Sequence, residues 1–144
     1  MLDRAWIAAR IPHQGKMCLL DAVESWNQSG ISCRTGSHRL PDNPLRTNGC
    51  LGIVNGIEYA AQAMAVHGAL LADNHITPSV GFLTSVRNVQ WHHTRLDHLD
   101  SDLMVRAECI SGNEVNILYS FDLHAEGTIL LSGRASVMLD AGIR

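Results

Sequence analysis

The sequence has 144 residues and a formal net charge of −3, and its hydrophobic and charged fractions of 46% and 17% are those of an ordinary globular protein. This length supports one hydrophobic core, so we expect a single domain over residues 1–144. The charge excludes the strongly basic surface of most nucleic-acid binders, and residues 1–10 are too short and too charged for a signal peptide or membrane span. The four cysteines form no CxxC pair, so we expect free thiols in a cytoplasmic protein that binds neither nucleic acid nor membrane.

The first half of the chain predicts two strands and one buried helix. Residues 17–26 and 30–37 have strand character and are joined by the polar turn 27–30. Residues 56–72 read GIEYAAQAMAVHGALLA. They favour a helix by propensity and are apolar on nearly every side, which predicts a buried helix. The prolines and glycines of residues 41–52 predict an irregular loop before the helix, where functional residues often lie.

The second half predicts four strands. The first covers residues 79–91, and the changed spacing between Val86 and Val89 indicates a bulge. Residues 103–109, 115–123 and 129–139 alternate apolar and polar side chains and are separated by short turns, which predicts an antiparallel meander. An antiparallel sheet wrapped around one long central helix is an α+β architecture, the hot-dog fold.

Glu58 is the most informative candidate for chemistry, because a carboxylate in the first turn of a mainly apolar helix needs compensation. It is either an acid/base group tuned by an apolar pocket or the second member of a capping box begun by Asn55. The spacing fits both interpretations. Gln62 lies one helical turn further on the same face, where it can hydrogen-bond Glu58 or a ligand.

His38 is the second candidate, because it follows a predicted strand and opens the proline-containing loop. A loop histidine is usually only solvated. A base that works near neutral pH and a protonatable carboxylate nevertheless form the pair needed to move one proton from carbon and another onto a leaving hydroxyl. His13 and His67 are better explained as a turn residue and a satisfied interior residue.

Metal and nucleotide chemistry lack support in the sequence. His92, His93 and His98 lie near several aspartates, but neighbouring strand residues point to opposite faces and do not share one ion. The chain has no GxSxG, P-loop or GxGxxG motif. We therefore expect no metal and no cofactor.

Three segments resemble the hot-dog beta-hydroxyacyl-acyl carrier protein dehydratases. Residues 11–21, with Ile-Pro-His and then Met-Cys-Leu-Leu-Asp, resemble the opening of that family. Residues 37–44 resemble the loop that carries its catalytic histidine, and residues 56–63, Gly-Ile-Glu-Tyr-Ala-Ala-Gln-Ala, resemble the helix start that carries its catalytic glutamate. The sequences of the last two segments most closely resemble those of the divergent ApeP-like branch of this family, which is associated with aryl polyene biosynthesis.

The resemblance implies removal of water from a 3-hydroxyacyl thioester on acyl carrier protein, giving the trans-2-enoyl thioester, with His38 as base and Glu58 as acid. It also implies that backbone N–H groups near Gly56 polarise the thioester carbonyl, that Gln62, Phe82 and Leu83 contact the substrate, and that no metal or redox cofactor is needed. The implied assembly is a homodimer, or a heterodimer with a related hot-dog subunit. The carrier protein is acidic, so the candidate residues for binding it are Arg39, Arg46, Arg87 and Arg95.

Two departures from the family keep other functions open. The segment between His38 and Glu58 is longer than in the housekeeping enzymes, and the usual His-Phe-Pro and Pro-Gly elements read here as His-Arg-Leu-Pro and Gly-Ile. The loop must therefore follow a different path. One rival function is a hot-dog acyl thioesterase, and the other is a non-catalytic subunit that completes a partner's dimer.

Overall fold

The computed structural model describes residues 1–11, 15–74, 81–113 and 115–139. His13 and the predicted strand start at residues 79–80 therefore lie outside the described residues. In the described part, no helix is long and apolar enough to cross a membrane.

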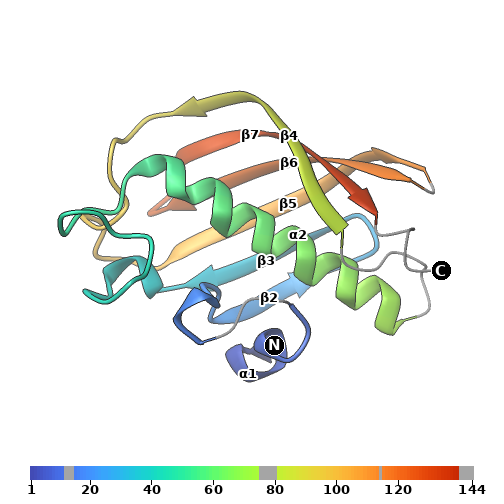
Figure 1. The fold of residues 1–144 in the computed structure, drawn as a ribbon, viewed down its shortest axis with the longest axis horizontal. Helices are drawn as coiled ribbons and strands as arrows, with labels where there is room; N and C mark the ends of the chain where they lie inside the picture. The colour runs from blue at the N-terminus through green and yellow to red at the C-terminus, as the bar shows by residue number, and fades with distance from the viewer. Residues whose placement is uncertain (12–14, 75–80, 114, 140–144) are drawn as a thin grey trace.

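The described residues form one antiparallel sheet of seven strands, in the order β1-β2-β3-β5-β6-β7-β4. The long helix α2, Gly56–Asp73, crosses the concave face of this sheet, with β4 along one edge (Figure 1). The predicted α+β hot-dog architecture is thus confirmed. The strands are β1 Leu2–Asp3, β2 Ala22–Trp26, β3 Gly30–Thr35, β4 Gly81–Trp91, β5 Leu103–Gly112, β6 Asn116–Ala125 and β7 Thr128–Leu139.

The turns follow from local chemistry. The side-chain oxygen of Asn27 accepts hydrogen bonds from the backbone N–H groups of Ser29 and Gly30, which closes the β2–β3 hairpin. Between β6 and β7, Glu126 and Gly127 both have positive φ, 53° and 77°. Two positive φ values are typical of the type I′ turn, whose twist matches that of the strands it joins. The predicted meander of β5, β6 and β7 is confirmed.

The predicted bulge in β4 is also confirmed. The register against β7 shifts between Arg87 and Gln90, and Asn88 between them has a φ of 54°. An extra residue at this point re-aims the strand and increases its twist.

The sequence predictions were right about the end of the first strand at Trp26 and the beginning of the second at Gly30, but wrong about the beginning of the first and the end of the second. Residues 15–17 form a short 3-10 helix and β2 begins only at Ala22, because Met17 and Leu19 form backbone hydrogen bonds with the side chain of Gln62. The second strand ends at Thr35, and residues 37–39 form another 3-10 helix. A short helix that the sequence analysis did not predict, α1 (Arg4–Ala8), is capped by the Asp3 side chain, which accepts from the Trp6 N–H.

The core lies between α2 and the sheet. The helix buries most of its length, as predicted, with Tyr59, Ala60, Ala63 and Val66 among its fully enclosed residues. The same helix leaves a partly exposed side, which carries Ile57, Glu58, Ala61 and Ala65. This side of the helix and the edge strand β4 are both partly uncovered.

Candidate active site

His38 is completely buried inside its own chain. It sits in the 3-10 helix Ser37–Arg39 (η2), which follows β3, rather than in a solvated loop. Its Nε2 lies 3.0 Å from the carbonyl oxygen of Leu99. A carbonyl oxygen only accepts, so Nε2 carries the proton and Nδ1 carries the lone pair.

The lone pair of His38 Nδ1 has no hydrogen-bond partner among the described residues, although the atom is buried. Burial lowers the pKa of His38, and the backbone groups of Leu99 and Ser101 oppose that shift. The imidazole is therefore neutral near pH 7, with a free basic nitrogen inside the protein. A buried polar atom without a partner calls for an explanation, and a catalytic role is one of the recognised ones.

The segment around Leu99 is held against the loop that precedes α2. Leu96 donates its backbone N–H to the Leu51 carbonyl at 2.8 Å, and the Leu51 N–H donates to Asp97 at 2.8 Å. The neighbouring Arg95 forms an ion pair with Asp97 that lowers the pKa of that carboxyl. These contacts hold the long segment between His38 and Glu58 against residues 95–99. They also hold in place the Leu99 carbonyl, which orients the His38 ring.

Glu58 lies in the first turn of α2 and is half-buried, on the partly exposed side of the helix. The capping-box interpretation was wrong, because the Asn55 side chain makes no capping hydrogen bond and instead donates to the Gly52 carbonyl at 3.1 Å. Asn55 belongs to the 3-10 helix Ile53–Asn55 (η3), which runs directly into α2 and has helical backbone angles. The helical turn takes the place of a side-chain cap.

Gln62 has both ends of its amide engaged by the backbone. Its Oε1 accepts from the Leu19 N–H at 2.9 Å, and its Nε2 donates to the Met17 carbonyl at 2.6 Å. The side chain is fully buried. This geometry makes Gln62 a strut between α2 and the segment before β2, and substrate contact by Gln62 remains a prediction.

Gly56 starts the helix where it packs most closely on the sheet. Its N–H donates back into the preceding 3-10 turn, to Ile53 and Val54. A Cβ on Gly56 would lie 2.6 Å from Leu131 Cδ2 and 3.0 Å from Leu123 Cδ2. The need for close approach therefore explains the glycine, and polarisation of a thioester by its N–H remains a prediction.

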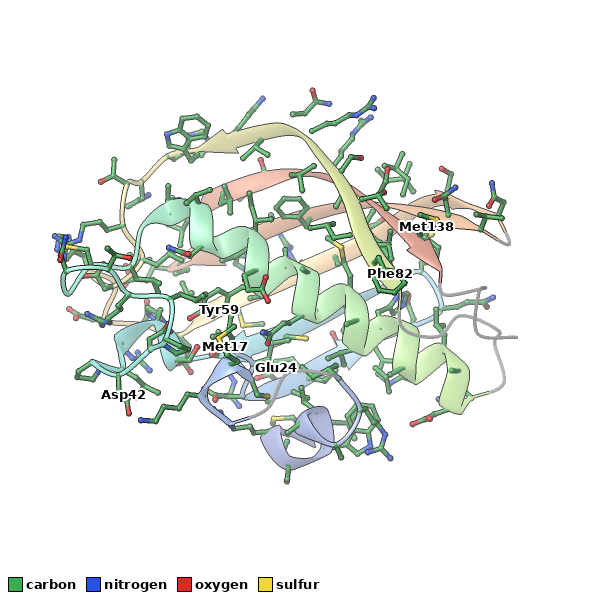
Figure 2. The ribbon with its side chains drawn as sticks, viewed as in Figure 1. Met17, Glu24, Asp42, Tyr59, Phe82 and Met138 are labelled. Atoms are coloured by element: carbon green, nitrogen blue, oxygen red, sulfur yellow. The ribbon has the colours of Figure 1, made fainter. Side chains whose placement is uncertain are left out.

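Phe82 and Leu83 lie on the edge strand and are exposed, at 61% and 41% of their surface. Phe82 pairs in register with Met138, and Figure 2 shows these two side chains close together. Leu83 pairs with Val137, which packs against the core, so Leu83 faces the same side as the core. Within a single chain these residues line an open edge rather than a closed pocket.

Three of the four arginines offered for docking are already engaged. Arg39 bonds Asp102 and the Asp100 carbonyl, Arg46 bonds the carbonyls of Gly49 and His38, and Arg95 bonds Asp97. Within the described part of the chain, Arg87 is the one of the four whose side chain makes no hydrogen bond or ion pair, although its backbone pairs in the sheet. Its role in docking stays a prediction.

The aspartates near His92 and His98 are held by arginines. Asp97 binds Arg95, and Asp102 binds Arg34 and Arg39. Over the described ranges, no group of three or more histidine, cysteine, aspartate or glutamate side chains has the arrangement of a metal site.

A polar groove of about 530 Å³ lies away from His38, over β2, β3, β5 and β6. Ser32, Arg106 and Asp122 line it, and they pair in register across the sheet. Their strand neighbours Cys33, Val105 and Leu123 are buried in the core, so the groove belongs to the opposite face of the sheet from α2. It is separate from the candidate site.

The structure adds residues that the sequence analysis did not single out. The Tyr59 hydroxyl is 2.8 Å from Ser37 Oγ, so the residue after Glu58 is hydrogen-bonded to the residue before His38. A hydroxyl in an otherwise apolar helix was the available signal, since a buried tyrosine usually finds a partner. The Leu99 carbonyl carries no signal in the sequence, because any residue provides one.

Comparison with known proteins confirms the family resemblance seen in the sequence. The family model for ApeP-like proteins, described as ApeP dehydratase, matches residues 5–141. No match was found among curated protein sequences.

Several solved structures share the fold. The dehydratase heterocomplex ApeI:P from Xenorhabdus doucetiae matches with a TM-score of 0.80 and 21% identity, covering 96% of this chain and 91% of that one. Zebra fish thioesterase superfamily member 2 matches at 0.66 and 14% identity, covering 96% and 99%. A hypothetical thioesterase with coenzyme A from Streptococcus pneumoniae matches at 0.59 and 13% identity, covering 81% and 83%. At these identities, the structural matches establish the hot-dog fold alone.

Proposed function

Because the chain belongs to the ApeP-like dehydratase family, we propose that it removes water from 3-hydroxyacyl thioesters carried on acyl carrier protein, as one subunit of a hot-dog complex. The product is the trans-2-enoyl thioester of a fatty-acid-like or polyene chain. All four cysteines are free thiols, which fits a reducing compartment, and we place the reaction in the cytoplasm.

The observation that carries the proposal is the state of the His38 ring. Its tautomer is fixed by the Leu99 carbonyl, its pKa is lowered by burial, and its Nδ1 lone pair lacks a protein partner in the described residues. A general base must hold a free lone pair at the working pH. His38 meets that requirement.

Glu58 supplies the complementary acid in this proposal. Nδ1 of His38 takes a proton from C2 of the substrate, and the C2–H electron pair forms the C2–C3 double bond. The C3–O bond breaks, and Glu58 protonates the departing hydroxyl, which leaves as water. The proton gained by His38 and the one lost by Glu58 balance, so exchange with solvent restores both groups.

The uncovered edge of the sheet supports a partner subunit. β4 is 11 residues long and lies at the edge of the sheet, where, among the described residues, β7 is the strand it pairs with and its other side is left without a strand partner. Leu83 and Trp91 at its two ends are 41% and 59% exposed, although both lie opposite core-facing residues of β7. A related hot-dog subunit placed against β4 would cover this apolar side and the nearby partly exposed side of α2.

The test is product analysis with a 3-hydroxyacyl-carrier protein. The chain is assayed alone and after co-expression with a related hot-dog subunit, and the products are resolved by mass spectrometry. Dehydration is expected to lower the mass of the loaded carrier by one water. Glu58→Gln and His38→Asn are each expected to lower kcat by about 10²- to 10⁴-fold. Arg106→Gln, on the opposite face of the sheet, is the matched control.

The rival functions predict different products. Release of free carrier thiol without loss of water would establish a thioesterase and refute the proposal. A non-catalytic partner role is favoured by one observation, that His38 has no exposed surface in the single chain. Full activity of a co-expressed pair carrying both Glu58→Gln and His38→Asn in this chain would establish that role.

A further inference from the structure

A buried network of hydroxyl and amide groups joins the helix that carries Glu58 to the turn that carries His38. The Tyr59 hydroxyl lies 2.8 Å from Ser37 Oγ and accepts from Asn43 Nδ2 at 3.1 Å. Ser37 Oγ donates to the Leu19 carbonyl at 2.7 Å, and Thr35 Oγ1 contacts the same carbonyl at 2.5 Å. All four side chains are at most 6% exposed.

The direction of the hydrogen bonds between Asn43, Tyr59 and Ser37 follows from the Asn43 amide and from the bond that Ser37 donates to the Leu19 carbonyl. An amide nitrogen only donates, so the Tyr59 oxygen receives a proton from Asn43 and must donate its own to Ser37. Ser37 then has one proton left to donate, which goes to the Leu19 carbonyl. The Asn43 amide also donates to the Ser37 carbonyl at 2.9 Å, which holds the loop in two places. A fully satisfied buried network of this kind rigidifies what it connects.

Because Tyr59 and Ser37 are the sequence neighbours of Glu58 and His38, we propose that Tyr59 is a positioning residue, which holds the turn of His38 at a fixed place relative to the helix of Glu58. Figure 2 shows Tyr59 projecting from the first half of α2 toward the loop that carries Asp42. That loop is the segment in which the chain departs from the housekeeping dehydratases. The network supplies the anchorage that such a long connection needs.

The network acts on His38 through its backbone, since none of its side chains hydrogen-bonds the ring. The ring itself is held by the Leu99 carbonyl, and the charged groups that act on it are Arg39 and Asp102. Arg46 binds the His38 carbonyl at 3.1 Å. Removing the Tyr59 hydroxyl leaves all of these in place and loosens only the attachment of the turn to α2.

Tyr59→Phe is therefore the informative change, assayed in the complex that shows dehydration. We expect kcat to fall about tenfold while KM changes less than twofold, because the substrate still binds but the base is less well placed. Loosening also admits water around the ring. The pKa of His38 should then rise toward its ordinary value, moving the acidic limb of the kcat/KM profile to higher pH.

Tyr119→Phe is the matched control. Tyr119 is as deeply buried as Tyr59, and its hydroxyl is 2.8 Å from His67 Nδ1, in a pair separate from the network. This variant also loses one buried hydroxyl, but kcat and the acidic limb should stay as in wild type. An equal loss of kcat in both variants would reduce the effect to general destabilisation and overturn the proposal, as would an unchanged kcat and pH profile in Tyr59→Phe.

Asn43→Ala provides a second variant if Tyr59→Phe does not fold, because it removes the donor at the start of the same chain of protons. The inference rests on the proposed function, yet the pKa of His38 can be followed by NMR without turnover. A rise in Tyr59→Phe or Asn43→Ala, absent in Tyr119→Phe, supports positioning even if no dehydration is found. If Tyr59→Phe keeps full dehydratase activity and the His38 titration is unchanged, the positioning role is refuted while the proposed function stands.

Discussion

The stability of the protein should fall as the pH drops below about 6.5, because two histidines are buried in a neutral form. His38 and His67 have 0% and 1% of their surface exposed, and burial lowers the pKa of each below the ordinary value of 6.5. His67 is held by the Tyr119 hydroxyl at 2.8 Å and the Asn27 carbonyl at 2.9 Å. As the pH falls, the unfolded chain therefore binds protons before the folded chain does.

The magnitude follows from the number of protons. Each histidine that is protonated only in the unfolded chain lowers the free energy of unfolding by about 1.4 kcal/mol per pH unit, so the slope contributed by the pair is at most about 2.7 kcal/mol per unit. Lowered pKa values mean that this stability is fully present above pH 6.5 and is lost as the pH falls. The lowered pKa values of Asp42, Asp97 and Asp102 act in the same direction, but only below their ordinary value of 3.8.

The measurement is urea unfolding at half-unit steps from pH 8.0 to 4.5. His67→Gln and His38→Gln should each remove one histidine's share of this slope, since glutamine does not titrate. His92→Gln, which replaces an exposed histidine, is the control and should leave the slope unchanged. A wild-type free energy of unfolding that stays flat across this range would refute the reasoning, because it would mean that the two rings take up protons in the folded state.

Three further changes test individual contacts. Gln62→Met leaves the buried Leu19 N–H and the part-buried Met17 carbonyl without their partner and should lower the free energy of unfolding by about 2–5 kcal/mol, with faster hydrogen exchange at the Leu19 amide; unchanged exchange there would contradict the strut role. Gly56→Ala places a methyl group 2.6 Å from a core leucine, and its overpacking cost of about 1–3 kcal/mol should outweigh a gain in helix propensity of about 1 kcal/mol, so a raised melting temperature would contradict the packing argument. Leu83→Lys should weaken capture of a hot-dog partner at least tenfold in size-exclusion titrations, while Thr84→Lys on the same strand is the comparison, and equal capture by both would contradict a partner seated on the apolar side of β4.

The parts of the fold that could be predicted are those whose local pattern and tertiary environment agree. The helix at residues 56–72 is rich in alanine and apolar on most sides, and it is buried where such a helix must be. The strands of the meander alternate, and the Glu126-Gly127 turn has the conformation that its glycine favours. Each of these elements is specified by its own residues, so no distant contact was needed to place it.

The parts that could not be predicted depend on distant partners. Residues 17–21 have strand character, but Gln62 takes the hydrogen bonds of Met17 and Leu19, which lie more than 40 residues away in sequence. The spacing of Asn55 and Glu58 fits a capping box, yet the preceding 3-10 turn supplies the helix start. The candidate residues His38 and Glu58 could be found from chemistry and resemblance, whereas their environments could not. The tautomer of His38, for example, depends on the main-chain carbonyl of Leu99, which the sequence does not reveal.

The two proposed catalytic groups therefore differ in how complete their surroundings are. The chain itself encloses His38, fixes its tautomer through Leu99 and removes it from water. Glu58 instead lies half-buried on the partly exposed side of α2. A carboxylic acid becomes a useful proton donor near neutral pH when its surroundings are made apolar. On the proposed function, a partner that covers this side of α2 would complete the acid while leaving the base as it is, so exchanging the partner should move the basic limb of the pH profile and not the acidic limb set by His38.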